Sequence, residues 1–359
     1  MGGVSDADTG FQFCSAISAH QTPLTIMNSP RDNMWTLLAG QLGPLMALGL
    51  VFAFFAVTDA VQSDGGRFTS LRNVQQMLVS SAPVVVGALG MTLVIIAGGI
   101  DLSAGTAIAL CATVLAFVLK QGGPIELALV CCVLTGCAAG CLNGLMISAL
   151  RVAPFIITLG TMTAYLGVAK LVADETTVRP ALESVPTWMN GLARPSPDPP
   201  WLLVAPGVWL MLAMAMGLSL LLRYTMFGRH VFALGSNEQT ARLCGLNVPA
   251  LKVAVYTLAG LFIGLAGIYQ FAKLKVGNPT SGLGLELKVI AAVVIGGASL
   301  SGGRGTVLGT LTGALLMQTI ASGCTQLGLN NPVQDIILGV IIVAAVTVDQ
   351  FRQSRTAES

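Results

Sequence analysis

Charged side chains are scarce in this chain. Lys, Arg, Asp and Glu together make up 9% of the 359 residues, and hydrophobic residues make up 54%. A soluble globular protein carries about 25% charged residues. So few polar side chains cannot cover a water-soluble globule of this length, which indicates that lipid is the main solvent.

Several classes of site are excluded by what else is missing. The net charge of +2 gives no basic stripe for nucleic acid, so no nucleic-acid partner is expected. The two histidines, His20 and His230, do not lie at metal-ligand spacing from a cysteine, which predicts no metal site. The eight cysteines lie mostly in apolar runs and are interpreted as packing residues rather than as a disulfide framework.

A phosphate-binding loop is also missing. Such a loop needs Gly-Lys followed by Ser or Thr, and none of the lysines follows a glycine. The chain is therefore not expected to hydrolyse ATP by that route, and no cofactor is predicted within it.

Long uncharged runs dominate what is present. A helix needs about 20 apolar residues to cross the hydrocarbon core, and the charged residues divide the chain into about ten such segments. The sequence predicts an all-α, polytopic membrane protein with a transmembrane permease domain over residues 35–350. The predicted segments cover residues 35–58, 73–100, 102–119, 127–150, 152–169, 201–222, 253–272, 289–303, 305–327 and 332–348.

Glycine breaks two of these segments. The chain reads AGGIDLSAG at residues 97–105 and IGGASLSGG at residues 295–303. Glycine-broken apolar segments in corresponding halves of a chain indicate the central pathway of a transporter. Non-helical backbone at membrane depth must be enclosed by protein or water. Both breaks are therefore expected to be internal and to form a pseudo-repeat.

Glycines at four-residue spacing predict close helix pairs, because small faces let two helix backbones approach in lipid. These glycines are Gly136, Gly140 and Gly144, then Gly260 and Gly264, and finally Gly309 and Gly313.

The polar stretches differ in kind. Residues 1–34 are expected to form a mobile N-terminal tail and residues 351–359 a C-terminal tail. Residues 174–200 are rich in proline and acid and are interpreted as an external loop. Residues 223–252 hold the main concentration of basic residues, which favours a cytoplasmic loop, although the total of Lys and Arg over the whole chain divides equally between the two sides.

A short polar helix at the membrane surface is predicted within residues 223–252. Ser236 followed three residues later by Gln239 is a capping-box pattern, and Gly245 can take the left-handed conformation that ends a helix. A surface helix that is attached to two membrane helices can pass a displacement on to them.

Four motifs in this order resemble one known family. They are GMTLVIIAGGIDLS at 90–103, APFIITLGTM at 153–162, GRHVFALGSNE at 228–238 and IAAVVIGGASLSGGRG at 290–305. From about residue 73 to 349 the chain is similar to the membrane permease subunits of bacterial ribose-type ABC sugar importers, within the branched-chain amino-acid and sugar permease superfamily.

The resemblance implies an assembly in the bacterial inner membrane. Two permease chains would form the path, a cytoplasmic ABC ATPase subunit would bind ATP and Mg, and a periplasmic sugar-binding protein would deliver a sugar, most simply a monosaccharide. In the wider importer class the coupling loop carries Glu-Ala-Ala, three variable residues and Gly, and this chain matches only the second Ala and the Gly. The implied ATPase-coupling helix contains Ser236, Asn237, Glu238, Gln239, Ala241, Arg242 and Gly245.

Polar residues at the breaks are candidates for the translocation path. A carboxylate at membrane depth is costly and indicates function. Asp101, assisted by Ser103, can instead cap the following helix near the cytoplasmic surface. Ser299, which has the same position in the second break, is also a good helix cap, and this favours a structural role for Asp101 over a role in the path. Arg304 either pairs with an acidic residue of the ATPase or lies at the membrane interface. The path candidates are Thr92, Asp101, Ser103, Ser299 and Ser301.

Two further sets of residues are given structural roles. Glu286 and Lys288 are expected to mark an external start of the eighth segment. Four aromatic residues near helix ends are interpreted as interfacial anchors rather than as rings that stack on a sugar. They are Tyr165, Tyr256, Tyr269 and Phe271.

Other functions stay open. An ion-coupled secondary transporter also uses broken helices, but it usually keeps several ionisable residues deep in the bundle, where this chain offers only Asp101. An ABC permease for branched-chain amino acids would differ in substrate alone. A structural or receptor membrane protein would leave both breaks and the coupling-like loop unexplained. The sequence does not choose the sugar, nor does it say whether the two permease chains are identical.

Overall fold

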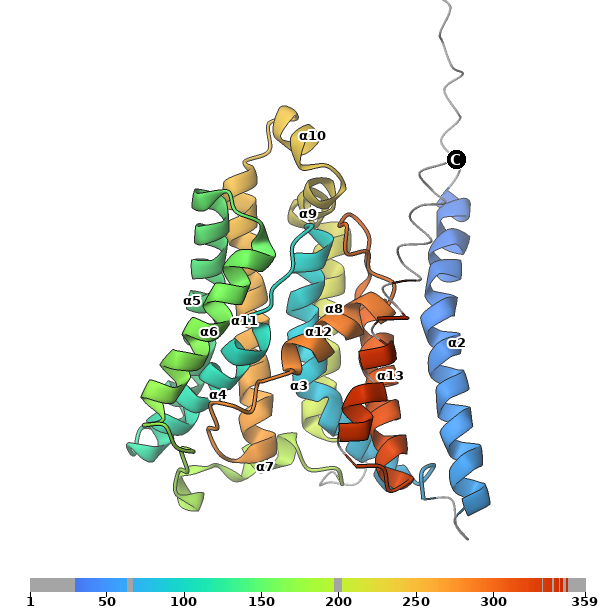
Figure 1. The fold of residues 1–359 in the computed structure, drawn as a ribbon, viewed down its shortest axis with the longest axis vertical. Helices are drawn as coiled ribbons and strands as arrows, with labels where there is room; N and C mark the ends of the chain where they lie inside the picture. The colour runs from blue at the N-terminus through green and yellow to red at the C-terminus, as the bar shows by residue number, and fades with distance from the viewer. Residues whose placement is uncertain are drawn as a thin grey trace, which may run out of the picture. The chain divides into compact units, whose positions relative to one another are not determined.

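The computed structural model is helical. It describes residues 30–62, 67–196, 202–330 and parts of 332–347. The expected C-terminal tail, and residues 1–29 of the expected N-terminal tail, lie outside the described residues. The helices, labelled as in Figure 1, are α2 (Pro30–Gln62), α3 (Leu71–Ile96), α4 (Ala104–Lys120), α5 (Ile125–Leu150), α6 (Pro154–Val172), η1 (Leu182–Ser184), α7 (Thr187–Leu192), α8 (Pro206–Tyr224), α9 (Met226–Ser236), α10 (Glu238–Leu243), α11 (Val248–Leu274), α12 (Leu285–Ile295) and α13 (Val307–Gln326).

Contacts divide the chain into two units, residues 1–40 and residues 41–359. Of the first unit the structure describes the helical backbone from Pro30. Helix α2 thus begins inside the stretch that was expected to be a tail. All contacts reported below lie in the second unit.

Seven helices in the described part of the chain are long and apolar enough to cross a membrane: α3, α5, α6, α8, α11, α13 and residues Leu42–Val61 of α2. The expected count of ten is not confirmed. Helix α4 has 17 residues and α12 has 11, so both are shorter than the roughly 20 residues that span the hydrocarbon core. The last expected segment, residues 332–348, is described only in part.

The eighth expected segment starts earlier than the sequence indicated. Helix α12 begins at Leu285, so Glu286 and Lys288 lie within the helix rather than before it. The sequence-based boundary assumed that charged residues lie outside the membrane segments. The side chain of Glu286 is instead buried among other helices of the same chain.

Helix α3 lies at the centre of the second unit. In its most apolar stretch 89% of the residues are buried, against 28% for α5 and α6. It packs against α11, α13, α12 and α8, and Figure 1 shows it between α11 on one side and α13 on the other. A helix that is apolar all round is suited to such an enclosed position.

The predicted close approach of glycine faces is confirmed between α5 and α11. A Cβ atom added to Gly136 would lie 2.7 Å from Gly264 Cα, and one added to Gly140 would lie 2.9 Å from Gly260 Cα. The thiol of Cys132 donates a hydrogen bond to the Gly264 carbonyl at 3.3 Å. The paired glycines of α13 close on α12 in the same way.

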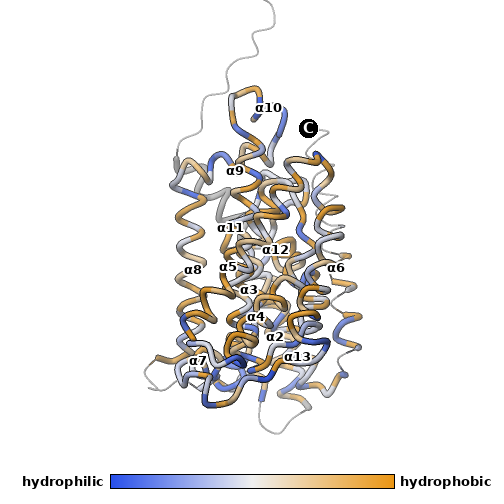
Figure 2. The backbone as a smooth tube through the Cα atoms, turned by 90° about the vertical axis from the view of Figure 1, so that its left-hand side faces the viewer, coloured by the Kyte–Doolittle hydropathy of each residue, from blue (hydrophilic) through white to orange (hydrophobic). Residues whose placement is uncertain are grey.

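The two ends of the bundle are polar. Figure 2 shows hydrophilic residues at the α10 end and at the α7 end, with hydrophobic backbone between them. At the α7 end, Val178 and Gly277 form an isolated antiparallel bridge, with distances of 2.8 and 2.9 Å from amide nitrogen to carbonyl oxygen. This bridge ties the loop after α6 to the end of α11.

Candidate functional site

The predicted surface helix is present, but its cap is Asn237 rather than Ser236. Asn237 Oδ1 accepts a hydrogen bond from the Thr240 amide at 2.9 Å. Ser236 instead ends the preceding helix α9, and its hydroxyl donates to the Phe232 carbonyl at 2.9 Å. The capping-box prediction was wrong by one residue because the sequence did not reveal that a helix already occupied residues 226–236. We call residues 225–247 the coupling segment.

The predicted role of Gly245 is confirmed. Its φ is +83°, the Gly245 amide donates to the Arg242 carbonyl at 3.1 Å, and the Leu246 amide donates to the Ala241 carbonyl at 3.1 Å. These two bonds close the C-terminal end of α10 through a left-handed glycine.

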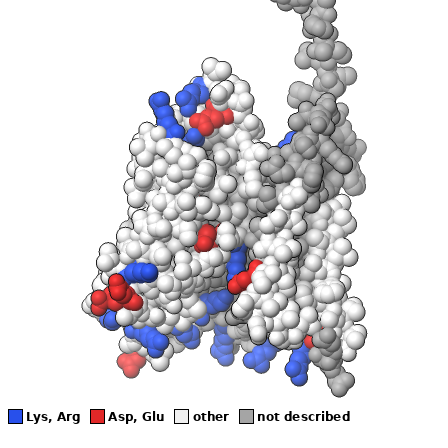
Figure 3. All heavy atoms as spheres, in the orientation of Figure 1, with Lys and Arg blue, Asp and Glu red and all other residues white. Residues whose placement is uncertain are grey.

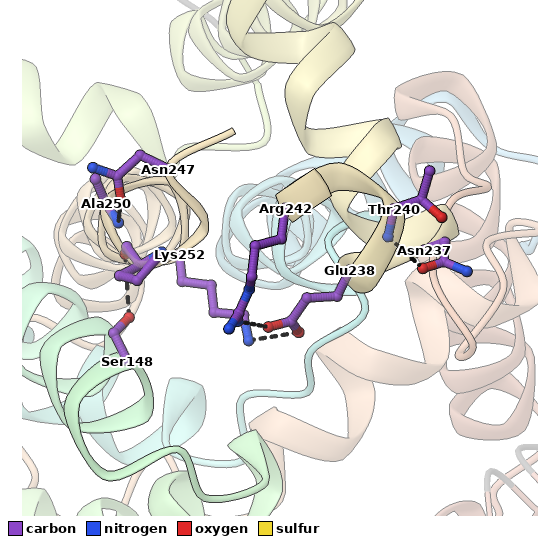
Figure 4. A network of polar contacts seen from close by, with 9 residues as sticks. Ser148, Asn237, Glu238, Thr240, Arg242, Asn247, Ala250 and Lys252 are labelled. Atoms are coloured by element: carbon purple, nitrogen blue, oxygen red, sulfur yellow. Dashed lines mark hydrogen bonds and ion pairs between the residues drawn. The ribbon is translucent and has the colours of Figure 1, made fainter. Parts of the chain in front are cut away.

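Glu238 ties α10 to the start of α11. Its carboxylate pairs with Arg242 at 3.1 Å and with Lys252 Nζ at 2.8 Å. Figure 4 shows Glu238 between these two cations, and it also shows Ser148 of α5 bound to the first turn of α11. Exposed ion pairs contribute little to stability, so the consequence is geometric: α10 is fixed to α11 and, through it, to α5.

The outer face of α10 is open to solvent. Leu243 is 89% exposed, whereas Ala241 is 4% exposed and packs inside the chain. Gln239, Arg242 and Gly245 are also exposed. Ala241 therefore packs α10 against the rest of the chain, and a partner would contact the exposed residues beside Ala241.

The coupling segment meets both glycine breaks at one point. The Gly303 amide, after α12, donates to the Ile96 carbonyl at the end of α3, 2.9 Å away. Gly235 lies against both groups: a Cβ there would overlap the Ile96 carbonyl oxygen and lie 2.6 Å from the Gly303 nitrogen. A Cβ on Gly302 would lie 2.7 Å from the Gly235 carbonyl oxygen. We call this three-way backbone contact the glycine junction.

The two breaks use the same two local turns. Two residues after the end of α3 lies the left-handed Gly98, and two residues after the end of α12 lies the left-handed Gly297. The amides at and after each of these glycines donate to carbonyls of the helix and close it. Next, Asp101 Oδ1 accepts from the Ser103 amide at 2.9 Å, as Ser299 Oγ accepts from the Ser301 amide at 3.3 Å. The left-handed glycine of the second break is one residue later than the sequence match placed it, and a repeat of whole halves is not confirmed by these turns.

Asp101 is buried, at 1% exposure, and does not lie at the surface. Its Oδ1 also accepts from the Ser103 hydroxyl at 2.6 Å, and Asn143 Nδ2 of α5 donates to that hydroxyl at 2.9 Å. Tyr165 of α6 donates to Asn143 Oδ1 at 3.0 Å and to the Ala139 carbonyl at 2.8 Å. Asp101 thus holds the turn that precedes α4, whose N-cap is Ser103, and links three helices.

Three buried side-chain atoms among the described residues have no hydrogen-bond partner. They are Asp101 Oδ2, Tyr256 Oη and Glu286 Oε2. The other oxygen of Glu286 accepts from the Gly284 amide at 3.0 Å. Buried polar atoms usually have a hydrogen-bond partner. A bound polar ligand or a second conformation of the protein would supply one for each of these three atoms.

The other path candidates are dispersed. Thr92 is buried, donates to the Ala88 carbonyl at 2.7 Å and lies 2.7 Å from the Thr310 hydroxyl of α13. Ser299 is buried in the second loop, whereas Ser301 and Arg304 are exposed. The structure therefore brings Asp101 together with Ser103, but it does not gather all five path candidates at one point.

Sequence reasoning did not single out Asn143, and it gave the tyrosines and Glu286 positions at helix ends that the structure does not bear out. Tyr165, Tyr256 and Tyr269 are 3–6% exposed and Phe271 is fully buried, so none is an interfacial anchor as expected. The available signal for Asn143 was an amide in an apolar run beside the small face of Gly140 and Gly144. Among the described residues, no group of three or more His, Cys, Asp or Glu side chains could hold a metal ion.

Comparison with known proteins gives the family. The family described as the branched-chain amino acid transport system permease component matches residues 73–346. The ribose import permease protein RbsC of Escherichia coli (strain K12) is 35% identical over 311 residues, or 86% of this chain and 95% of the relative. RbsC of Bacillus subtilis (strain 168) is 36% identical over 312 residues, or 87% and 95%. The autoinducer 2 import system permease protein LsrC of Photorhabdus luminescens is 30% identical over 309 residues, or 86% and 89%.

No solved structure matches the chain. The family match covers both glycine breaks and the whole coupling segment. With seven membrane-length apolar helices, the chain is a multi-pass protein of the inner membrane, and it belongs to the family of branched-chain amino acid transport system permease components.

Proposed function

We propose that this chain is the permease subunit of an ATP-binding-cassette importer for a sugar, with a monosaccharide as the simplest cargo. The relatives with the highest identity quoted above are ribose import permeases, and a third relative belongs to an autoinducer 2 import system. The observation that carries the mechanism is the glycine junction, where the coupling segment touches both broken segments.

The motor in this proposal is a separate cytoplasmic ATPase subunit, which binds ATP and Mg and hydrolyses ATP. It docks on the exposed face of α10, where Leu243 supplies an apolar anchor and Gln239 and Arg242 supply polar contacts. Apolar side chains at the centre of an interface contribute most when a partner surrounds them. The exposed Arg304 lies one residue beyond the glycine junction and is a further contact for the motor.

Movement of the docked motor would reach the path by two routes. The Glu238 to Lys252 ion pair makes α11 follow α10. The glycine junction makes the end of α3 and the loop after α12 follow α9, because backbone contacts without side chains leave no flexible spacer between them. Tightly packed contacts of this kind transmit small displacements.

The breaks then form the gate of the path. Helices α4 and α12 act as half-helices, and together with the last segment expected from the sequence, residues 332–348, they complete ten membrane segments arranged as a pseudo-repeat. Thr92, Asp101, Ser103, Ser299 and Ser301 contribute neutral or singly charged groups near the gate. Two copies of the permease, or this chain and a related one, enclose the path, and a periplasmic sugar-binding protein delivers the cargo.

Reconstitution tests the proposal. The permease, its ATPase subunit and the sugar-binding protein are incorporated in liposomes, and uptake of labelled ribose, autoinducer 2 and leucine is measured with ATP inside. ATP-dependent uptake of a sugar that stops when either partner is omitted supports the proposal. Uptake of leucine alone would support the amino-acid alternative, and uptake by the permease alone under an ion gradient would contradict the proposal.

A further inference from the structure

Tyr256 of α11 carries a hydroxyl group that the proposed mechanism does not use. Its side chain is 3% exposed, and its Oη has no hydrogen-bond partner among the described residues. The Tyr269 hydroxyl, on the same helix, donates to the Gly207 carbonyl at 2.7 Å, and the Tyr165 hydroxyl has two acceptors. A buried tyrosine usually finds a partner for its hydroxyl, so Tyr256 differs from both.

The Tyr256 side chain reaches from the contact between α5 and α11 to the first glycine break. A Cβ on Gly140 would overlap the Tyr256 carbonyl oxygen, and a Cβ on Gly144 would lie 3.2 Å from the Tyr256 Cβ. At the other end of the side chain, Oη would lie 2.5 Å from a Cβ on Gly99. The backbone of Tyr256 is therefore held against α5, and the absence of a side chain at Gly99 leaves room for the hydroxyl beside the break.

Asp101 supplies an unpaired acceptor at the same break. It follows Gly99 by two residues, and its carboxylate acts electrostatically on the Tyr256 hydroxyl. Oδ1 accepts two bonds from Ser103, whereas Oδ2 has no partner. None of the three ion pairs in the described part of the chain involves Asp101. On the face that Figure 3 shows, Lys and Arg gather at the α10 end and toward the opposite end.

Helix α11 is also the helix that α10 holds by an ion pair. Tyr256 lies four residues after Lys252, whose Nζ pairs with Glu238 of α10 at 2.8 Å. Residues four apart lie on the same face of a helix, so a displacement that moves Lys252 also moves Tyr256. The end of α3 instead follows α9, through the glycine junction. A change in the angle between α9 and α10 therefore shifts Tyr256 relative to the first break.

We propose that Tyr256 is a positioning residue for the first break. When α10 is displaced, the Tyr256 hydroxyl donates a hydrogen bond to Asp101 Oδ2, and both atoms gain the partner that they lack in this conformation. A buried polar atom without a partner costs free energy, so the new bond favours the displaced conformation over this one. The inference rests on the proposed function, because that function supplies the motor that displaces α10.

Tyr256→Phe tests the inference because it removes the hydroxyl and keeps the ring. Tyr269→Phe is the matched control, since it removes a hydroxyl that is already paired. Both variants are measured in the complete importer, with uptake of labelled ribose and of labelled autoinducer 2 into liposomes and with thermal unfolding of the nucleotide-free complex in detergent.

The two variants should respond in opposite ways. Tyr256→Phe should keep or raise the unfolding temperature, because it removes an unpaired buried atom. Its maximal uptake rate should fall about tenfold, the factor that corresponds to one hydrogen bond to a charged group, with an unchanged KM for the cargo. Tyr269→Phe should lower the unfolding temperature and keep the uptake rate per folded importer.

The outcomes separate this inference from the proposed function. If the wild-type importer takes up neither ribose nor autoinducer 2, the proposed function fails. If the wild type transports and Tyr256→Phe transports equally well, the hydroxyl has no part in the cycle. A lower unfolding temperature for Tyr256→Phe would show that the hydroxyl is already paired in the resting importer. A raised KM at an unchanged maximal rate would assign the hydroxyl to the cargo. Each of the last three results overturns the inference.

A structure of the importer trapped with ATP and vanadate tests the bond directly. We expect Tyr256 Oη about 2.7 Å from Asp101 Oδ2 in that state, the usual distance between two hydrogen-bonded oxygens. Two atoms that remain apart in the trapped importer would overturn the inference even if Tyr256→Phe impairs uptake.

Discussion

The amide of Gly303 closes the C-terminal end of α3 by donating to the carbonyl of Ile96, 2.9 Å away. These residues belong to the two glycine breaks, which are far apart in the sequence. Gly235 of the coupling segment covers the contact. The last carbonyl of the central helix α3 is therefore satisfied by a loop far away in the sequence. The coupling segment, which is proposed to meet the motor, packs over this contact.

Gly235→Ala should impair transport more than it impairs folding. The added Cβ overlaps the Ile96 carbonyl oxygen, so the coupling segment must move away from both breaks. We expect uptake to fall at least tenfold while ATP hydrolysis by the assembled importer continues. Gly217→Ala in the neighbouring α8 is the control, because nothing lies within 4 Å of its new Cβ. Equal uptake by both variants would remove the junction from the mechanism.

Leu243→Ser should weaken attachment of the ATPase subunit without destabilising the permease. The side chain is 89% exposed, so it contributes little to folding, whereas an anchor buried by a partner is worth about 2 kcal/mol or more. Co-purification of the two subunits measures the effect. Leu182→Ser, at 83% exposure on the opposite end, should co-purify normally. A Leu243 variant that retains its ATPase would place the docking surface elsewhere.

Asp101→Asn should leave the fold intact, and Asn143→Leu should destabilise it. An asparagine keeps the oxygen that accepts from Ser103. Leucine removes one hydrogen bond from Ser103 and one from Tyr165, although each hydroxyl keeps another partner, and a hydrogen bond contributes about 0.5–1.5 kcal/mol. Thermal unfolding in detergent measures both. Exposed Thr163→Val is the control for Asn143→Leu, and an Asp101→Asn protein that folds but does not transport would favour the path interpretation of this carboxylate.

Gly140→Ala should destabilise the bundle although alanine is the better helix former. Replacing an exposed helical glycine by alanine stabilises by about 1 kcal/mol, but the new Cβ here would overlap the Tyr256 carbonyl oxygen and lie 2.9 Å from Gly260 Cα. Gly167→Ala in α6 has nothing within 4 Å and should keep or raise stability. Chemical denaturation of the two variants compares them directly, and opposite signs are expected.

Much of the fold follows from local patterns. Glycine spacing predicted which helix faces pack closely, because a backbone without side chains lets two helices approach at fixed intervals. It did not predict that the faces of α5 and α11 pair with each other. Gly245 was recognised because few other residues adopt a left-handed helix end. The family resemblance rests on four motifs that the family match spans. The ends of the membrane segments were less predictable, because charged residues were used to mark them. Glu286 is a charged residue that lies buried within the bundle and not at a segment end.

By itself the sequence determined that lipid is the main solvent, that the fold is helical, which glycine faces pack closely and which family the chain resembles, because composition and short-range spacing express these directly. Only the tertiary structure decided that Gly235, Ile96 and Gly303 meet, and that Asn143 joins Ser103, and through it Asp101, to Tyr165. Such contacts join residues far apart in the chain, and nothing in the local pattern around one partner specifies the position of the other.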